Sequence, residues 1–144
     1  MTDYLTSQLI LHGTVCMLVG LLCGVPLGRA INNDHGDATV HGWRVAHLGL
    51  ALGGPLLYSI AAILPRISDH GGISSVATWS FVASVYGFVI ALPPGAAIRE
   101  RGLRSGRGLS QLVYVGNLIG AAGSLVGTLA LLGLVLVSML SGQQ

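Results

Sequence analysis

The few charged side chains of this 144-residue chain are gathered into short segments, and this feature restricts its fold more than any other. Seven basic and five acidic residues make up 8% of the sequence, whereas a soluble domain carries about 25% charged residues. Charge-free stretches lie between them at 4–28, 45–65, 70–98 and 108–144. A helix needs about 20 mainly apolar residues to cross the hydrocarbon core of a bilayer. Each stretch therefore predicts one membrane-spanning helix, and a soluble globular monomer is excluded.

The predicted fold is an all-α integral membrane four-helix bundle, in a single domain over residues 1–144. We expect the spans near 5–28, 43–64, 73–92 and 111–140. Pro93–Pro94–Gly95 is expected to end the third span, because proline removes a helical hydrogen bond. The segment 32–38 is expected to be a polar loop. A transmembrane barrel is excluded, because no stretch alternates between polar and apolar residues.

The arginines predict the orientation of these spans. Six of the seven lie in the segments 29–44 and 93–110, which four spans place on the same side of the membrane. The positive-inside rule assigns that side to the cytoplasm, so both termini are expected on the non-cytoplasmic side. This rule explains the net charge of +2 better than nucleic-acid binding does. The expected partner is the lipid bilayer, and no nucleic acid.

Small residues recur at helical spacing on three of the predicted spans. Glycines four positions apart stack on one helix face and let two backbones approach closely. Packing within the bundle is the simpler interpretation, and contacts between subunits or with a flat ligand are the alternative. The pairs and triplet concerned are Gly20/Gly24/Gly28, Gly49/Gly53, Gly116/Gly120 and Gly123/Gly127.

Six polar side chains lie within the predicted spans and are candidates for a functional site, because burying polar groups in lipid costs free energy. Four of them lie roughly 4–9 Å from the cytoplasmic ends of their spans, counted at about 1.5 Å per residue. The other two lie more than about 20 Å from those ends. The first set is His47, Tyr86, Tyr114 and Asn117, and the second is His12 and Tyr58. We therefore predict the site in the cytoplasmic half.

His47 is the candidate ligand. Gly49 and Gly53 follow it by two and six positions; we expect them to leave open space beside its ring and to take part in cofactor binding. A neutral imidazole in an apolar wall is suited to bind haem iron. The alternative is a hydrogen bond from His47 to a carbonyl of a neighbouring helix, and we favour such a helix–helix bond for His12. Tyr86 either bonds a backbone carbonyl or, at the level of His47, orients a small oxygen-bearing substrate.

One segment carries a longer motif, Gly42-Trp43-Arg44-x-Ala46-His47-x-Gly49-x-Ala51-Leu52-x-Gly54, with His12-Gly13 before it and Leu64-Pro65 after it. This pattern resembles the styrene oxide isomerase family of small bacterial membrane enzymes. The resemblance implies haem b with ferric iron bound by His47. It also implies a homotrimer with haem between subunits in the bacterial cytoplasmic membrane. The implied substrate is a small apolar aryl epoxide. Its C–O bond opens under Lewis-acid activation and a hydride migrates to give an aldehyde. Tyr86 falls where the family has a tyrosine that holds the substrate.

Two positions differ from the family pattern. Gly53 stands where the family has an asparagine, and Ala77–Thr78 where it has an acidic residue. We predict that Asn117, on the fourth span, supplies a replacement amide at the catalytic site. Two alternatives to an isomerase stay open: a haem protein that transfers electrons or acts as a sensor, and a scaffold without a cofactor.

Overall fold

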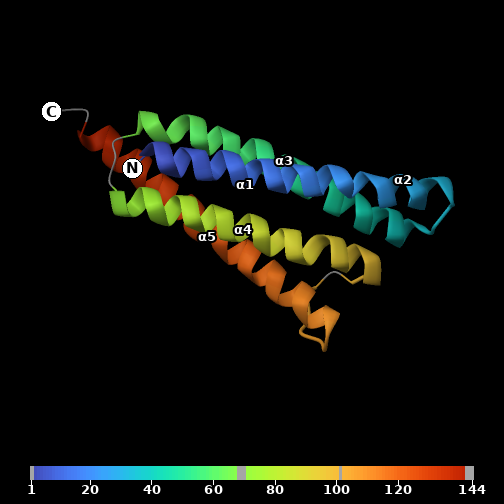
Figure 1. The fold of residues 1–144 in the computed structure, drawn as a ribbon. Coiled ribbons are helices and arrows are strands. Elements are labelled where there is room, and N and C mark those ends of the chain that lie inside the picture. Colours follow the sequence, from blue (N-terminus) through green and yellow to red (C-terminus); the bar gives the residue numbers. More distant parts are fainter. Residues whose placement is uncertain (1, 68–70, 101, 142–144) are drawn as a thin grey trace.

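The computed structural model describes residues 2–67, 71–100 and 102–141, and these residues form helices joined by short turns (Figure 1). Four segments are long and apolar enough to cross a membrane, at Asp3–Asn32, Asp37–Arg66, Gly72–Ile98 and Leu109–Ser141. The predicted four-helix membrane fold is therefore confirmed. The elements are α1 (Thr2–Leu22), α2 (Gly24–Asn32), α3 (Asp37–Ile63), η1 (Leu64–Arg66), α4 (Gly71–Ile98) and α5 (Leu109–Ser141).

The first span is interrupted at Cys23, which separates α1 from α2. The Cys23 N–H donates to Val19 O at 3.0 Å, and the Leu27 N–H donates to Cys23 O at 3.2 Å. Pro26 occupies the first turn of α2, where its missing N–H costs little. The hydrogen bonds therefore continue through the interruption, and α2 follows the line of α1 (Figure 1).

Two predicted boundaries are wrong. α4 continues through Pro93 and Pro94 to Ile98, because the φ angle of proline suits a helix and each proline removes only one hydrogen bond. The Glu100 N–H donates to Gly95 O at 2.9 Å beyond the prolines and closes the end of this helix. The loop predicted at 32–38 is also shorter, since α3 already begins at Asp37.

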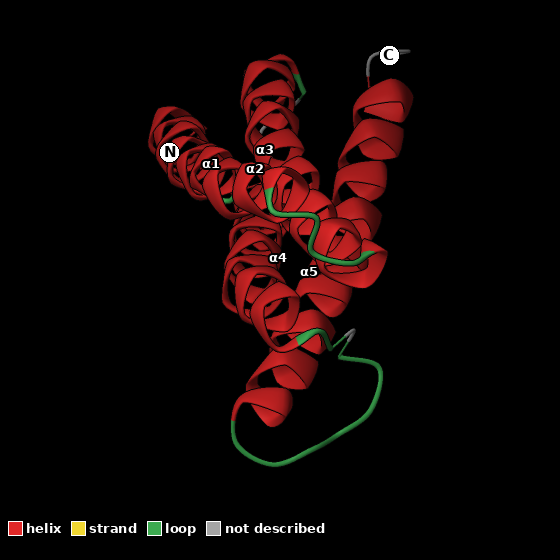
Figure 2. Ribbon diagram, turned by 90° about the vertical axis from the view of Figure 1, so that its right-hand side faces the viewer, coloured by secondary structure: helices red, strands yellow, loops and turns green. Residues whose placement is uncertain are grey.

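The helices pack mainly as two pairs, α1 with α3 and α4 with α5. α5 crosses α4 and diverges from the other helices (Figures 1 and 2). In the most apolar window of each span, 44% of α4 is buried but only 11% of α5. The turn between α2 and α3 and the loop between α4 and α5 lie at the same end of the bundle (Figure 1). Both arginine-bearing connections therefore share one end, as predicted.

Glycines mediate the contacts inside both pairs. An added Cβ at Gly87 on α4 would lie 2.7 Å from Gly116 O on α5, and one at Gly116 would lie 2.8 Å from Gly87 O. An added Cβ at Gly54 on α3 would likewise lie 2.8 Å from Gly13 O on α1. Such distances leave no room for a side chain. Gly116 belongs to the predicted pattern, and so does Gly20, where an added Cβ would lie 2.7 Å from Leu50 C, so the packing interpretation is confirmed at these two positions. Gly28 differs, because nothing lies within 4 Å of an added Cβ.

Candidate functional site

The ring of His47 on α3 lies against α1. Its Nδ1 is 2.8 Å from the carbonyl oxygen of Gly20, and an added Cβ at Gly24 would lie 3.3 Å from the ring. A carbonyl oxygen only accepts, so Nδ1 carries the proton and the lone pair is on Nε2. Among the described residues, Nε2 has no hydrogen-bond partner. The half-buried imidazole is thus held in one tautomer with one nitrogen available as a ligand.

This bond to Gly20 is compatible with both predicted roles of His47. It is the hydrogen bond to a neighbouring carbonyl that formed the alternative interpretation, and that bond is confirmed. Histidines that bind a metal almost always donate their other ring N–H to a carbonyl, a carboxylate or water. The carbonyl bond therefore fixes the tautomer that a ligand role requires.

The open space predicted beside His47 is not provided by the expected glycines. An added Cβ at Gly49 would point toward Leu92 on α4, and one at Gly53 would lie 2.9 Å from Cys16 Sγ. Residues two and six positions apart from His47 on a helix do not share its face. The glycine that borders the ring is Gly24, from the neighbouring segment. The Gly20/Gly24 spacing was the only sequence signal for this contact.

Tyr86 does not lie at the level of His47, and that prediction is wrong. Its Oη is 2.8 Å from Nδ1 of His12 on α1, eight residues before the Gly20 carbonyl that meets His47. Eight helical residues correspond to about 12 Å along the axis and about 80° around it. The depth count failed because it placed the ends of α3 and α4 at one level, whereas the α2–α3 end of the bundle extends beyond the end of α4 (Figure 1).

His12 has both ring nitrogens occupied. Nδ1 meets Tyr86 Oη, and Nε2 is 3.2 Å from Oε1 of Gln8 one turn earlier. The predicted helix–helix hydrogen bond of His12 is therefore confirmed. Because a metal ligand needs a free ring nitrogen, His47 rather than His12 is the histidine suited to bind iron.

Asn117 lies in a different place from both histidines. It lines a cavity of about 310 Å³ at the junction of α3, α4 and α5, together with His41 and Glu100. The Gly102 backbone packs directly against its amide nitrogen. His47 does not line this cavity, because its ring faces α1. Within one chain, the structure therefore does not bring Asn117, the predicted replacement amide, close to His47, the predicted iron ligand.

A larger apolar cavity of about 630 Å³ opens between α3, α4 and α5. Leu52 and Leu56 border it while remaining 67% and 54% exposed, so it opens toward the outer surface of the spans. The polar side chains that line it are Ser84, Ser124 and Thr128. The hydroxyls of Ser84 and Ser124 are 2.7 Å apart, and each lies 2.7 Å from Gly120 O, which accepts the hydrogen bond. Gly49 and Gly53 line this cavity, and their role in cofactor binding stays a prediction.

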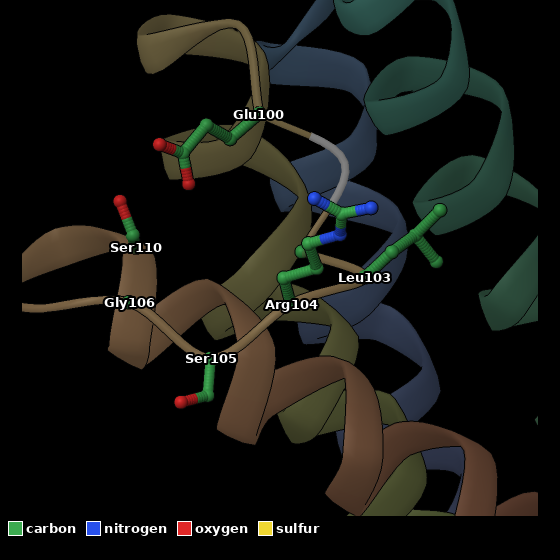
Figure 3. A pocket seen from close by; sticks show the side chains of 7 residues that line it. Glu100, Leu103, Arg104, Ser105, Gly106 and Ser110 are labelled. Atoms are coloured by element: carbon green, nitrogen blue, oxygen red, sulfur yellow. The ribbon is translucent and has the colours of Figure 1, made fainter.

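The loop between α4 and α5 borders an open cavity of about 350 Å³, whose lining includes Glu100, Arg104, Ser105 and Ser110. Figure 3 shows the Glu100 carboxylate and the Ser110 hydroxyl near one another, with the Arg104 guanidinium beside Leu103. None of the predicted site residues lines this cavity. It is therefore a feature of the connecting loop, separate from the candidate site.

The family model of styrene oxide isomerase matches residues 5–137, which cover all four spans and both candidate histidines. The chain belongs to the styrene oxide isomerase family. No curated protein and no solved structure was found to match the chain. Membership in the styrene oxide isomerase family indicates an epoxide isomerase, and the four apolar helices make it a multi-pass membrane protein.

The two departures from the family pattern occupy distinct environments. Gly53 packs against Cys16, where a larger side chain would require a shift. Thr78 is fully buried, and among the described residues its hydroxyl has no hydrogen-bond partner. A threonine hydroxyl carries no charge into this position of α4, so burial costs much less than for a carboxylate.

Proposed function

We propose that this protein is a haem-b-dependent isomerase that converts a small apolar aryl epoxide into an aldehyde. The observation that carries the proposal is the geometry of His47. Its Nδ1 is bonded to Gly20 O at 2.8 Å, and its Nε2 lone pair has no partner among the described residues. This Nε2 atom fits haem iron, since a histidine in an apolar environment with a fixed tautomer is the usual proximal ligand of haem. Bound haem would supply ferric iron as a Lewis acid toward the epoxide oxygen.

The chain's own residues would do three things. His47 would hold the iron through Nε2, and the Gly20 carbonyl would keep that nitrogen basic by accepting a hydrogen bond from Nδ1–H. The apolar cavity between α3, α4 and α5 has the size of a small-molecule site, about 300–1,000 Å³. Neither His47 nor Tyr86 is among the residues that line it, so it would take up the substrate before the substrate reaches the iron. Its lining by Phe81 and Phe88 would exclude water and suit an aryl group. Its opening beside Leu52 and Leu56 would admit an apolar substrate from the bilayer.

We propose a homo-oligomer, a trimer by family resemblance, with haem between the subunits. In one chain, His47 and Tyr86 meet α1 about 12 Å apart along its axis. Neighbouring copies would allow His47 of one chain and Tyr86 of another to face one ligand. The little-buried α5 leaves a large apolar surface for such contacts or for lipid. The proposed location is the bacterial cytoplasmic membrane, with both termini on the non-cytoplasmic side, as the arginine-bearing loops indicate.

The test is the absorption spectrum of the detergent-purified protein, followed by an aldehyde assay with styrene oxide. We expect a haem Soret band and aldehyde formation in the wild type, and colourless, inactive protein for His47→Ala. His35→Ala is the matched control, because His35 is exposed in the turn before α3, and it should keep both. A full Soret band in His47→Ala would remove His47 as the ligand. A haem-containing wild type that is inert toward aryl epoxides would favour the electron-transfer or sensing alternative. A wild type without pigment would favour the alternative of a scaffold without a cofactor.

A further inference from the structure

The hydroxyl of Tyr86 is held by a histidine from another helix. We propose that His12 is a positioning residue, which accepts the hydrogen bond of the Tyr86 hydroxyl and so directs the hydroxyl proton toward α1. Tyr86 then faces the substrate with its oxygen lone pair and its ring. The inference rests on the proposed function and adds a residue to it. It starts from the contact of 2.8 Å between His12 Nδ1 and Tyr86 Oη, which joins α1 to α4 inside the membrane-spanning region.

The direction of the hydrogen bonds follows from Gln8. The Oε1 atom of Gln8, which is 3.2 Å from His12 Nε2, is an amide carbonyl oxygen and can only accept. Nε2 therefore carries the ring proton, and Nδ1 is left with its lone pair. Nδ1 must then accept from the hydroxyl of Tyr86. The chain of bonds runs from Tyr86 through His12 to Gln8, with each group in one defined role.

The rings around this bond limit its freedom to rearrange. The His12 and Tyr86 rings meet edge-on, with centroids 5.4 Å apart and planes at 78°. The Trp79 ring lies on α4 with its centroid 6.2 Å from that of His12. Tyr86 and His12 are both half-buried, so the pair is partly accessible from outside the bundle. A polar pair in an apolar segment has few other partners, which favours keeping this bond.

The proposed reaction does not need a proton from Tyr86. The C–O bond at one epoxide carbon breaks, and its electron pair stays on oxygen. A hydride moves from the neighbouring carbon to the carbon that has become positive, and a C=O bond forms. All atoms and electrons are conserved, and no proton enters or leaves. Positive charge develops on carbon, and an aromatic face attracts such charge. A tyrosine whose proton is turned away toward His12 suits that role.

A purely structural role for His12 makes a different prediction, and the chain contains a matched control. Thr14 Oγ1 on α1 is 2.9 Å from Tyr58 Oη on α3. This is also a hydrogen bond between a tyrosine hydroxyl and α1, and Tyr58 is half-buried like Tyr86. If His12 only joins helices, then breaking either bond should affect the enzyme alike.

The experiment measures kcat, KM and haem content for His12→Leu, His12→Asn, Tyr86→Phe, the double variant His12→Leu/Tyr86→Phe, and Tyr58→Phe. We expect His12→Leu to lower kcat about tenfold, the effect of one lost hydrogen bond, with KM and haem content within about twofold of the wild type. In His12→Asn the amide oxygen can still accept from Tyr86, so kcat should recover to within about threefold. Tyr58→Phe should leave kcat unchanged.

The double variant decides whether His12 acts through Tyr86. In the Tyr86→Phe background, His12→Leu should have no further effect on kcat, because the hydroxyl that it positions is gone. Independent, multiplying effects would overturn the inference, and so would an unchanged kcat in His12→Leu or an equal loss in Tyr58→Phe. A wild type that forms no aldehyde from styrene oxide would instead refute the proposed function, so the two failures are distinguishable.

A second measurement covers the case in which His12→Leu does not fold. Wild-type protein and Tyr86→Phe, both labelled with ¹⁵N-histidine, are compared by NMR. We expect one histidine of the wild type with an unprotonated, hydrogen-bonded Nδ1 and a protonated Nε2, and we expect its Nδ1 signal to shift in Tyr86→Phe. A histidine that responds to the substitution but carries its proton on Nδ1 would overturn the inference.

Discussion

The contact between Gly24 and His47 allows a direct test of the ligand geometry. In Gly24→Val, the Cβ atom would lie 3.3 Å from both Nδ1 and Cε1 of the imidazole. This is inside the usual contact distance of about 3.5–4.0 Å. Two further methyl groups make the crowding worse, so the ring must move away from α2. We expect the bond of 2.8 Å from Nδ1 to Gly20 O to break.

The size of the effect follows from the role of that bond. Loss of a hydrogen bond that orients a metal-binding histidine typically costs 10- to 100-fold in metal affinity, which corresponds to about 1.4–2.8 kcal/mol. The assay is a titration of haem-free protein with haem in detergent, followed at the Soret band. We expect the Kd of Gly24→Val to rise by 10- to 100-fold. Gly24→Ala adds only the one contact at 3.3 Å and should change Kd by less.

The matched control is Gly28→Val, one turn later on α2. Nothing lies within 4 Å of an added Cβ at Gly28, so the substitution meets open space in the chain. Its haem affinity should stay within about threefold of the wild type, the range of a weak local effect. Equal weakening by Gly24→Val and Gly28→Val would refute the reasoning, because displacement of the His47 ring would then not be the cause.

Two further predictions concern the fold. Gly87→Ala should destabilise the contact of α4 with α5 by about 1–3 kcal/mol through overpacking, since its Cβ would lie 2.7 Å from Gly116 O. The control Gly133→Ala, whose Cβ meets nothing within 4 Å, should be neutral or slightly stabilising. Thermal unfolding in detergent compares the two variants, and equal unfolding midpoints would contradict the packing argument. A periplasmic reporter such as alkaline phosphatase should be active when fused after Ser141 and inactive when inserted at Asp34, and the reverse pattern would show that the arginine-bearing loops face away from the cytoplasm.

Much of the fold could be predicted, because the bilayer imposes a strong rule on composition. Charged groups are excluded from hydrocarbon, so the positions of the charges mark the spans before any contact is known. The glycine spacing likewise predicted close contact between helices, which Gly20 makes with α3 and Gly116 makes with α4. The end of α4 could not be predicted from Pro93 and Pro94 alone. A proline pair near a helix end can be accommodated when the neighbouring hydrogen bonds are kept.

The candidate site was only partly predictable. The choice of His47 and the two possible roles of its ring follow from residue type and an apolar setting. The glycine beside the ring was wrongly chosen, because Gly49 and Gly53 were counted along the same helix and their true neighbours lie on α4 and α1. The depth of Tyr86 was wrong for a related reason. Counting residues gives a position along one helix, but it does not give the offset between two helices.

The sequence by itself determined that this chain has four helices suited to span a membrane, with arginine-bearing connections at one end and two histidines, His12 and His47, within the spans. These properties depend on the solvent, which is hydrocarbon, and on the chemistry of single residues. Only the tertiary structure decided that His47 meets the Gly20 carbonyl and that Tyr86 meets His12. A hydrogen bond needs two atoms within about 3 Å. His47 and Gly20 are 27 positions apart in the sequence and Tyr86 and His12 are 74 apart, so the offset between the packed helices decides whether these atoms meet.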